Sequence, residues 1–384
     1  MKLVPGNRIT LYKNGAALFP AIIAALDAAT ADIRVEAYIF KDDSAGEMIA
    51  DALSRAARRG VAVRMLIDGF GSTQTPEHFF SPMQAAGVSL LFYRPARGQW
   101  FPTRHRLQRL HRKIVLVDGK VGFTGGINFI DDFNQNFSLT HPRLDYAVGF
   151  EGPVLTEIYE SVFRLWRTTK WFTDLRMQHG GTLPLVSDNA VGATTLAFVT
   201  RDNLRHRRSI ERQYRLAIAG AQRSVLIACP YFLPGKRLRD ALMDAAQRGV
   251  VVEVLLQGVA DYPLLQLATR SMYGNFLAAG VVIYEYQPSM LHAKVAVVDD
   301  CWATVGSSNL DPFSLVLNRE ANIIAQDAAF AATLRASLRD EIDRNAIRLD
   351  AVAWRQRSLL RRIASWLALA LLRLVSAPFG VPRD

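Results

Sequence analysis

Two stretches of the sequence follow the same plan: residues 21–69, AIIAALDAATADIRVEAYIFKDDSAGEMIADALSRAARRGVAVRMLIDG, and residues 212–258, RQYRLAIAGAQRSVLIACPYFLPGKRLRDALMDAAQRGVVVEVLLQG. Each stretch reads as a helix, an apolar strand, an amphipathic helix and a Val-rich strand. Gly60 and Gly249 end the second helix of each stretch, where a glycine can take the left-handed conformation of a helix C-terminus. The chain therefore contains an internal duplication of an α/β unit.

The duplication continues through one more strand, within Gly87–Pro95 in the first copy and Gly280–Pro288 in the second. Strands that are apolar throughout and alternate with helices indicate a buried, largely parallel sheet. The predicted fold class is α/β, with two homologous α/β/α halves related by a pseudo-twofold axis and a C-terminal amphipathic helix.

The boundaries follow from the duplication and from one linker-like stretch. Gly180–Gly192 is rich in glycine and polar residues, as a connection between domains would be. We expect the first half at residues 1–180, the second half at 193–350, and a membrane-associating amphipathic segment at 351–384.

Polar residues with identical spacing follow the apolar strands in both copies. In each copy the order is His-x-Lys, four apolar residues, Asp, six residues, and a glycine-rich turn that ends in Asn. The first set is His111, Lys113, Asp118 and Asn128, and the second is His292, Lys294, Asp299 and Asn309. Residues i and i+2 of a strand share a face, so each copy presents an imidazole beside an ammonium group.

This set of side chains fits the chemistry of a phosphodiester. One histidine can attack the phosphorus and the other can protonate the leaving oxygen, because the imidazole pKa lies near neutrality. Two lysines and the two asparagines can bind the non-bridging oxygens. The predicted site needs no metal ion and no cofactor.

Each histidine also needs a hydrogen-bond acceptor for its other ring nitrogen. Asp145 and Glu320, downstream of the two asparagines, are the candidates for this orienting role. Asp118 and Asp299 are included among the candidate catalytic residues as members of the repeated motif. Their position at turns, before Gly119 and Asp300, favours a turn-forming role instead.

The paired H-x-K-x4-D-x6-G-[GS]-x-N motifs resemble those of the phospholipase D superfamily, over roughly residues 6–345. Segments such as Tyr231–Gly235 and Gly306–Pro312 are similar to the bacterial cardiolipin synthase branch, in its short type without an N-terminal pair of transmembrane helices. The resemblance implies a phosphatidyl transferase that joins two phosphatidylglycerols, releases glycerol and passes through a phosphohistidine. It also implies attack by His111 and protonation by His292. Gly126 departs from the usual Gly-Ser-x-Asn, which puts in doubt an equal contribution of the two halves to phosphate binding.

Composition predicts an anionic partner. Lys and Arg total 46 against 35 Asp and Glu, a formal net charge of +11. This charge suits a phospholipid surface or nucleic acid equally well. The first copy also carries a 12-residue insertion within Ala96–Arg109, ARGQWFPTRHRLQR, which has four arginines and no acid. We expect this insertion to form a lid or a lipid-facing rim.

The C-terminal segment predicts membrane contact. In a helix, one stripe would hold Arg and Ser side chains and the rest of Leu359–Val375 would be almost wholly apolar; the stripe is Arg355, Ser358, Arg362, Ser365, Arg373 and Ser376. The alternative is a helix packed on the protein's own core or on a second subunit. With no signal peptide pattern and no apolar run of about 18 residues, we expect a peripheral protein at the cytoplasmic face of the bacterial inner membrane.

Three functions compete at this point. The first is cardiolipin synthesis on anionic phospholipid, and the second is a phospholipase D, nuclease or other soluble phosphodiesterase with the same two-histidine chemistry. The third is a membrane-binding protein without activity. The intact His-x-Lys pairs argue against the third, and the apolar C-terminal segment makes nucleic acid an unlikely partner. The oligomeric state stays open.

Overall fold

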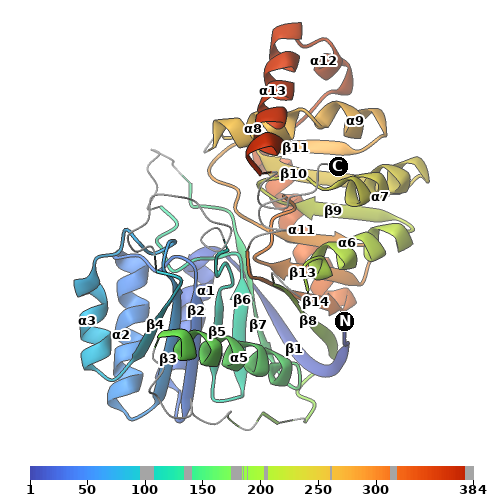
Figure 1. Ribbon diagram of the computed structural model, residues 1–384. Coiled ribbons are helices and arrows are strands. Elements are labelled where there is room, and N and C mark those ends of the chain that lie inside the picture. The colour runs from blue at the N-terminus through green and yellow to red at the C-terminus, as the bar shows by residue number, and fades with distance from the viewer. Residues whose placement is uncertain are drawn as a thin grey trace.

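The structure is a computed structural model, and its strands form one sheet of 15 strands across the whole molecule (Figure 1). The strand order is β15-β11-β10-β9-β12-β13-β14-β8-β1-β7-β6-β5-β2-β3-β4. The structure describes residues 1–95, 108–133, 141–173, 184, 186–187, 189–202, 206–259, 262–311 and 318–376.

The described residues of the first half form seven strands and four helices. In chain order they are β1 Val4–Lys13, α1 Asn14–Asp27, β2 Asp32–Ala37, α2 Ser44–Arg58, β3 Ala62–Asp68, α3 Glu77–Ala85, β4 Ser89–Tyr93, β5 Ile114–Val117, β6 Val121–Gly125, β7 Tyr146–Glu151 and α5 Leu155–Thr173.

The elements of the second half follow a similar order and continue beyond it at the C-terminal end. They are β8 Thr194–Arg201, α6 Ser209–Gly220, β9 Ser224–Ala228, α7 Lys236–Gln247, β10 Val251–Gln257, α8 Pro263–Arg270, α9 Tyr273–Ala278, β11 Val282–Tyr286, β12 Val295–Val298, β13 Trp302–Gly306, β14 Glu320–Gln326, α11 Ala328–Asn345, β15 Ala346–Arg348, α12 Ala351–Arg355 and α13 Leu359–Ser376.

The two half-sheets have matching strand orders, 1-7-6-5-2-3-4 and 8-14-13-12-9-10-11, and they join edge to edge. At the join β1 runs antiparallel to β8, with Val4 opposite Leu196 and Asn7 opposite Thr194. The buried Asn7 side chain donates to the Val4 carbonyl at 2.6 Å and accepts from the Val154 N–H at 2.9 Å. The expected duplicated α/β fold with two related halves is therefore confirmed.

The expectation of a largely parallel sheet is wrong. Among the described strands, β2-β3-β4 and β9-β10-β11 are the parallel sets. The strands β5, β6, β7 and β1, and their counterparts β12, β13, β14 and β8, pair antiparallel with their neighbours. The reason is the short turn between β5 and β6, and between β12 and β13, which can join only antiparallel strands.

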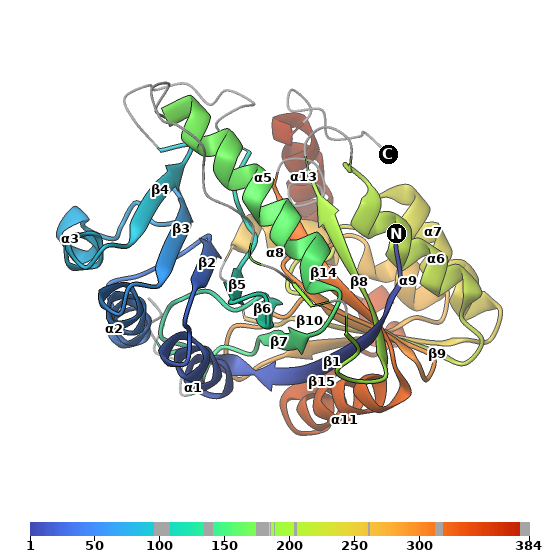
Figure 2. The same ribbon diagram turned by 90° about the horizontal axis from the view of Figure 1, so that it is seen from below.

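Helices cover both faces of the sheet (Figures 1 and 2). In the first half α1, α2 and α3 pack on one face through residues such as Ile22, Leu53 and Phe80, and α5 lies on the opposite face. The core under α5 is continuous with the core under α11, since both helices contribute to one buried cluster. This shared core fixes the two halves relative to each other.

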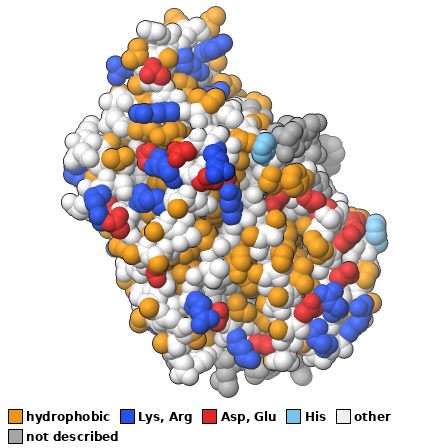
Figure 3. Space-filling view, turned by 180° about the vertical axis from the view of Figure 1, so that it is seen from behind, with side chains coloured by type: hydrophobic (Ala, Val, Ile, Leu, Met, Phe, Trp, Pro, Cys, Tyr) orange, Lys and Arg blue, Asp and Glu red, His pale blue; other side chains and the backbone are white. Residues whose placement is uncertain are grey.

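The C-terminal helix α13 packs against α8 with a narrow face that includes Ser365, Ala368 and Leu372, all at most 9% exposed. The polar stripe expected from the sequence is therefore wrong at Ser365, which is buried against α8 instead of lying on a polar face. Its hydroxyl donates to the Arg361 carbonyl of the same helix. The outer face exposes large apolar side chains: Leu359, Leu360, Ile363, Trp366, Leu367, Leu371 and Leu374. Seen from behind, hydrophobic and Lys or Arg side chains adjoin at this end of the molecule (Figure 3). No helix in the described ranges is both long and apolar enough to cross a membrane.

Candidate active site

The two repeated motifs lie together at the junction between the halves. The main-chain N–H of His111 donates to the Arg319 carbonyl at 3.0 Å, and that of His292 donates to the Leu144 carbonyl at 2.8 Å. Each histidine therefore lies beside a segment of the opposite half. Both His-x-Lys segments precede β5 and β12 rather than lying within them.

Each histidine is hydrogen-bonded to an acid of the other half. His111 Nδ1 lies 2.9 Å from Glu320 Oε2, and His292 Nδ1 lies 2.6 Å from Asp145 Oδ2. Both carboxyl groups are almost completely buried. A carboxylate at Nδ1 favours the tautomer with its proton there, which leaves the Nε2 lone pair for attack on phosphorus. The sequence predicted both acids, but not that each one serves the histidine of the opposite half.

The two lysines lie beside the histidines and are also buried. Lys113 Nζ donates to the His111 carbonyl at 2.9 Å, and Lys294 Nζ donates to the His292 carbonyl. Burial lowers the pKa of Lys113 to about 7, and repulsion from Lys294 adds to this effect. Burial lowers the pKa of Lys294 to about 8, and repulsion from Arg143 adds to it. Such lysines gain most from a nearby anion, which would restore their positive charge.

The two His–acid pairs differ electrostatically. Burial alone would raise the pKa of Glu320, but the interactions with His111, Lys113 and Ser307 outweigh it and hold this pKa below its usual value. Burial raises the pKa of Asp145 to about 7. It also lowers the pKa of both histidines, that of His292 more strongly. Glu320 is thus ionised at neutral pH, whereas Asp145 titrates near it.

The departure at Gly126 explains part of this difference. Its counterpart Ser307 donates its hydroxyl to Glu320 Oε2 at 2.5 Å. A Cβ atom at Gly126 would lie 2.2 Å from Asp145 Oδ1, so no serine fits there without moving the carboxyl group. The first half therefore combines Gly126 with Asp145, and the second half combines Ser307 with the longer side chain of Glu320.

The two asparagines are buried beside the motifs. Asn128 Oδ1 accepts from the Ile39 N–H at 3.4 Å. Asn309 Oδ1 is buried and has no hydrogen-bond partner within the described part of the chain. Their role in phosphate binding remains a prediction.

The structure places Asp118 and Asp299 at turns away from the histidines. Each follows β5 or β12 at the far end from the histidine, with φ of 53° and 48°. Asp118 accepts from the main-chain N–H groups of Thr30, Ala31 and Asp32 at 2.8 Å. Asp299 accepts in the same way from Gln222 and Arg223, which precede β9, and from Ser224, its first residue. Both aspartates hold turns, as their position in the sequence favoured.

Sequence reasoning missed two residues that hold the histidine segments. Asp68 Oδ2 accepts from the Leu110 N–H at 2.7 Å, and Gln257 Oε1 accepts from the Leu291 N–H at 2.5 Å. These N–H groups belong to the residues directly before His111 and His292. Asp68 and Gln257 end the Val-rich strands at equivalent positions of the duplication, MLIDG and VLLQG, and this equivalence was the available signal.

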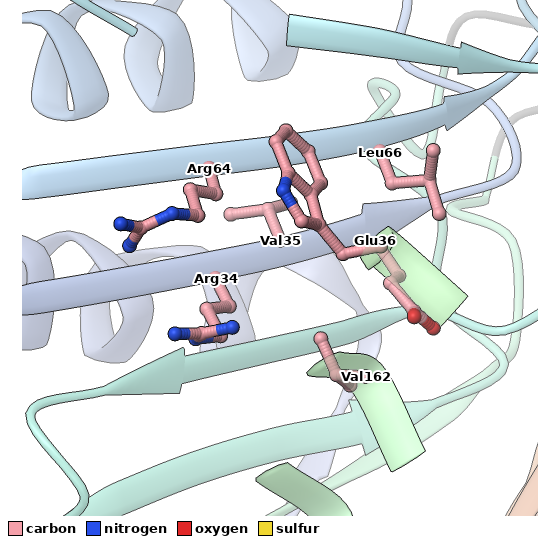
Figure 4. A pocket seen from close by; sticks show the side chains of 7 residues that line it. Arg34, Val35, Glu36, Arg64, Leu66 and Val162 are labelled. Carbon is pink, nitrogen blue, oxygen red and sulfur yellow. The ribbon is translucent and has the colours of Figure 1, made fainter. Parts of the chain in front are cut away.

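The first motif has an additional anchor beneath α5. Arg112, between His111 and Lys113, donates to Glu36 Oε1 at 2.6 Å and to the hydroxyl of Ser161 at 2.8 Å. Beside it is a cavity of about 10 Å³ lined in part by Arg34, Glu36 and Arg64 (Figure 4). That volume holds at most one water molecule, so the cavity is no ligand site. The second copy has Ala228 and Ala293 at the positions of Glu36 and Arg112, and both are buried in an apolar core.

Two expectations fall partly outside the described part of the chain. They are the proposed lid at Ala96–Arg109, of which residues 96–107 are not described, and the expected linker Gly180–Gly192, of which residues 180–183, 185 and 188 are not described. Within the described residues, no group of three or more His, Cys, Asp or Glu side chains is arranged to hold a metal ion.

Comparison with known proteins agrees with this geometry. The family model described as "Cardiolipin synthase, PLD-like domain" matches residues 22–141 and 214–341, one match in each half. The chain is 37% identical over 380 residues to cardiolipin synthase B of Shigella flexneri. The aligned region covers 98% of this chain and 90% of the relative. It is 34% identical over 344 residues to cardiolipin synthase A of Pseudomonas putida, which covers 89% and 70%.

Solved structures show the same fold at lower identity. The phosphatidylserine synthase of Haemophilus influenzae superposes with a TM-score of 0.67 at 15% identity, covering 97% of this chain and 94% of that one. The polyphosphate kinase of Porphyromonas gingivalis superposes with a TM-score of 0.57 at 14% identity, covering 96% and 53%. With its two-segment family match and its near full-length relatives, the chain belongs to the cardiolipin synthase family of phospholipase D-like proteins.

Proposed function

We propose that this protein is a phosphatidyltransferase that converts two molecules of phosphatidylglycerol into cardiolipin and glycerol. The observation that carries the proposal is the pair of crossed His–acid contacts, His111 with Glu320 and His292 with Asp145. Family membership supplies the lipid substrate, because the full-length relatives bear the name cardiolipin synthase.

In the first step we assign the attack to His111. Its Nε2 forms a bond to the phosphorus of one phosphatidylglycerol, and the bond from phosphorus to the glycerol oxygen breaks. The resulting phosphohistidine carries positive charge on its ring, which an ionised Glu320 stabilises. Lys113 and Lys294 balance the charge of the non-bridging oxygens.

His292 supplies the proton for the departing glycerol oxygen. Because burial raises the pKa of Asp145 to about 7, the Asp145–His292 pair retains an extra proton near neutral pH. In the second step His292 takes the proton from a hydroxyl of the second phosphatidylglycerol. That oxygen attacks the phosphorus, the P–N bond breaks, and His111 returns to its neutral state.

We also propose that the protein is peripheral to the cytoplasmic face of a bacterial inner membrane. The support is the outer face of α13, where seven large apolar side chains are at least 46% exposed. Arginines of the same helix suit anionic headgroups, at about 1 kcal/mol each near the surface. The alternative, a second subunit that covers this face, would bury the same side chains without a membrane.

The test is the lipid composition formed when the purified protein is incubated with vesicles of labelled phosphatidylglycerol. Mass spectrometry should detect cardiolipin together with an equal amount of free glycerol. Phosphatidic acid as the main lipid product would assign the protein to the hydrolases. Cleavage of DNA or of soluble phosphodiesters alone would assign it to the phosphodiesterases.

A further inference from the structure

We propose that Arg143 binds the phosphate of the second phospholipid, the acceptor, and thereby selects an anionic acceptor over water or a neutral alcohol. The inference rests on the proposed function and specifies the side of the site on which the acceptor lies. Its starting point is the segment that carries Asp145.

The main chain directs Arg143 toward His292. Leu144 pairs with Leu291 in a parallel bridge, and the Leu144 N–H donates to the Met290 carbonyl at 2.9 Å. In an extended segment residues i and i+2 share a face. Arg143 is therefore on the face of Asp145, whose carboxyl group contacts His292, whereas Leu144 between them is buried in the core.

The guanidinium group of Arg143 is available to an anion. Arg143 is half-buried, and its Nε atom is buried without a hydrogen-bond partner within the described residues. It forms no ion pair within those residues, although its charge offsets part of the effect of burial, which raises the pKa of Asp132 and of Asp145. It likewise adds to the burial and lysine effects that lower the pKa of His292. The preceding residues 134–140, NQNFSLT, contain no acid that could neutralise it.

The equivalent position of the other half carries no charge. Asn318 precedes Glu320 by two residues, as Arg143 precedes Asp145, so it is the counterpart of Arg143 beside His111. The arginine is therefore specific to the side of the site that contains His292.

The chemistry explains why that side needs a positive charge. The acceptor oxygen approaches phosphorus from the side opposite the phosphohistidine, so with His111 as nucleophile it enters beside His292. When the acceptor is phosphatidylglycerol, its own phosphate follows the attacking hydroxyl at the distance of one glycerol unit. Water and simple alcohols bring no such phosphate. An arginine next to His292 can form charge-assisted hydrogen bonds to that phosphate and hold the acceptor in place.

The test measures how the phosphohistidine divides between two acceptors. Phosphatidyl-p-nitrophenol serves as donor in micelles of neutral detergent, with phosphatidylglycerol and ethanol as competing acceptors. Arg143→Asn, which installs the residue of the other half, should lower the ratio of cardiolipin to phosphatidylethanol by about 10-fold or more, the effect of one hydrogen bond to a charged group. Arg143→Lys should lower it less, because the positive charge remains.

Arg237→Gln is the matched control, since it removes one exposed positive charge from α7 and should leave the product ratio unchanged. The ratio reports only on active molecules, so partial misfolding does not affect it, and Arg143→Lys gives the answer if Arg143→Asn does not fold. An unchanged ratio in both Arg143 variants would overturn the inference. If the wild type forms phosphatidylethanol but no cardiolipin, the proposed function itself fails.

Discussion

At the scale of single residues, the two halves of the site are similar but not equivalent. Glu320 accepts from both His111 and Ser307, whereas Asp145 lies against Gly126 and has no serine beside it. The first arrangement stabilises a carboxylate, and the second leaves a carboxyl group that titrates near neutrality. We propose that this difference divides the roles of nucleophile and acid between the two histidines.

Gly126→Ser should therefore impair catalysis although it restores the usual family motif. The new Cβ would lie 2.2 Å from Asp145 Oδ1 and displace the carboxyl group from His292. A misplacement of this size costs on the order of 10-fold to 100-fold in kcat. Gly220→Ser is the control, because a Cβ atom there meets nothing within 4 Å. Wild-type rates of cardiolipin formation in Gly126→Ser would show that Asp145 does not need this position.

The activity should fall as the pH rises. Lys113 and Lys294 have pKa values of about 7 and 8, so both are charged below this range and lose their protons above it. Each loss removes a positive charge from the phosphate site, and kcat/KM reports the pKa values of the free enzyme. A profile of kcat/KM measured with phosphatidylglycerol should decline between about pH 7 and pH 9. A flat profile over this interval would mean that the lysines remain charged or are not needed.

At the scale of the elements, the ends of β3 and β10 hold the histidine segments in place. Asp68 and Gln257 differ in charge, yet each accepts a hydrogen bond from the residue directly before His111 or His292. Asp68 also accepts from the N–H groups of Phe70 and Gly71, which ties it to its own turn. Gln257 is thus the better position for a test.

Gln257→Leu should lower kcat about 10-fold with little change in KM, because the backbone before His292 loses its buried acceptor. Gln257→Glu keeps an oxygen in place and should retain more activity than the leucine variant. The control is Gln266→Leu, since Gln266 donates to the Gln257 and Gly258 carbonyls of the same loop but not to the histidine segment. Equal losses in the leucine and glutamate variants would contradict a positioning role.

The outer face of α13 should bind the membrane. Trp366 and Leu367 are 70% and 61% exposed, and burying two such side chains in lipid contributes about 2 kcal/mol or more each. Trp366→Ser combined with Leu367→Ser should reduce binding to anionic vesicles at least about 10-fold in a flotation assay. Cleavage of a soluble phosphodiester should persist. Leu216→Ser, on α6 and 54% exposed before substitution, is the control. Unchanged flotation of the double variant would assign membrane contact to another surface.

At the scale of the whole molecule, the sequence predicted the features that the two halves share but not the contacts between the halves. The duplication and the His, Lys and Asn sets were visible as equal spacings. Pairing of His111 with Glu320 could not be predicted, because it depends on how the halves join through β1 and β8. The antiparallel strands were missed because strands buried on both faces have the same apolar pattern in either direction. Ser365 was misplaced because a helical stripe does not show which side meets α8.

The central claim is that two His–acid pairs, each built from both halves, transfer a phosphatidyl group through a covalent bond to His111. The direct measurement is peptide mass mapping of the His292→Ala variant, quenched in acid-free conditions after reaction with phosphatidyl-p-nitrophenol. Its good leaving group needs no acid, so the account predicts a phosphatidyl adduct on His111 and none in His111→Ala. An adduct mapped to His292 in the wild type, or turnover without any adduct, would contradict it.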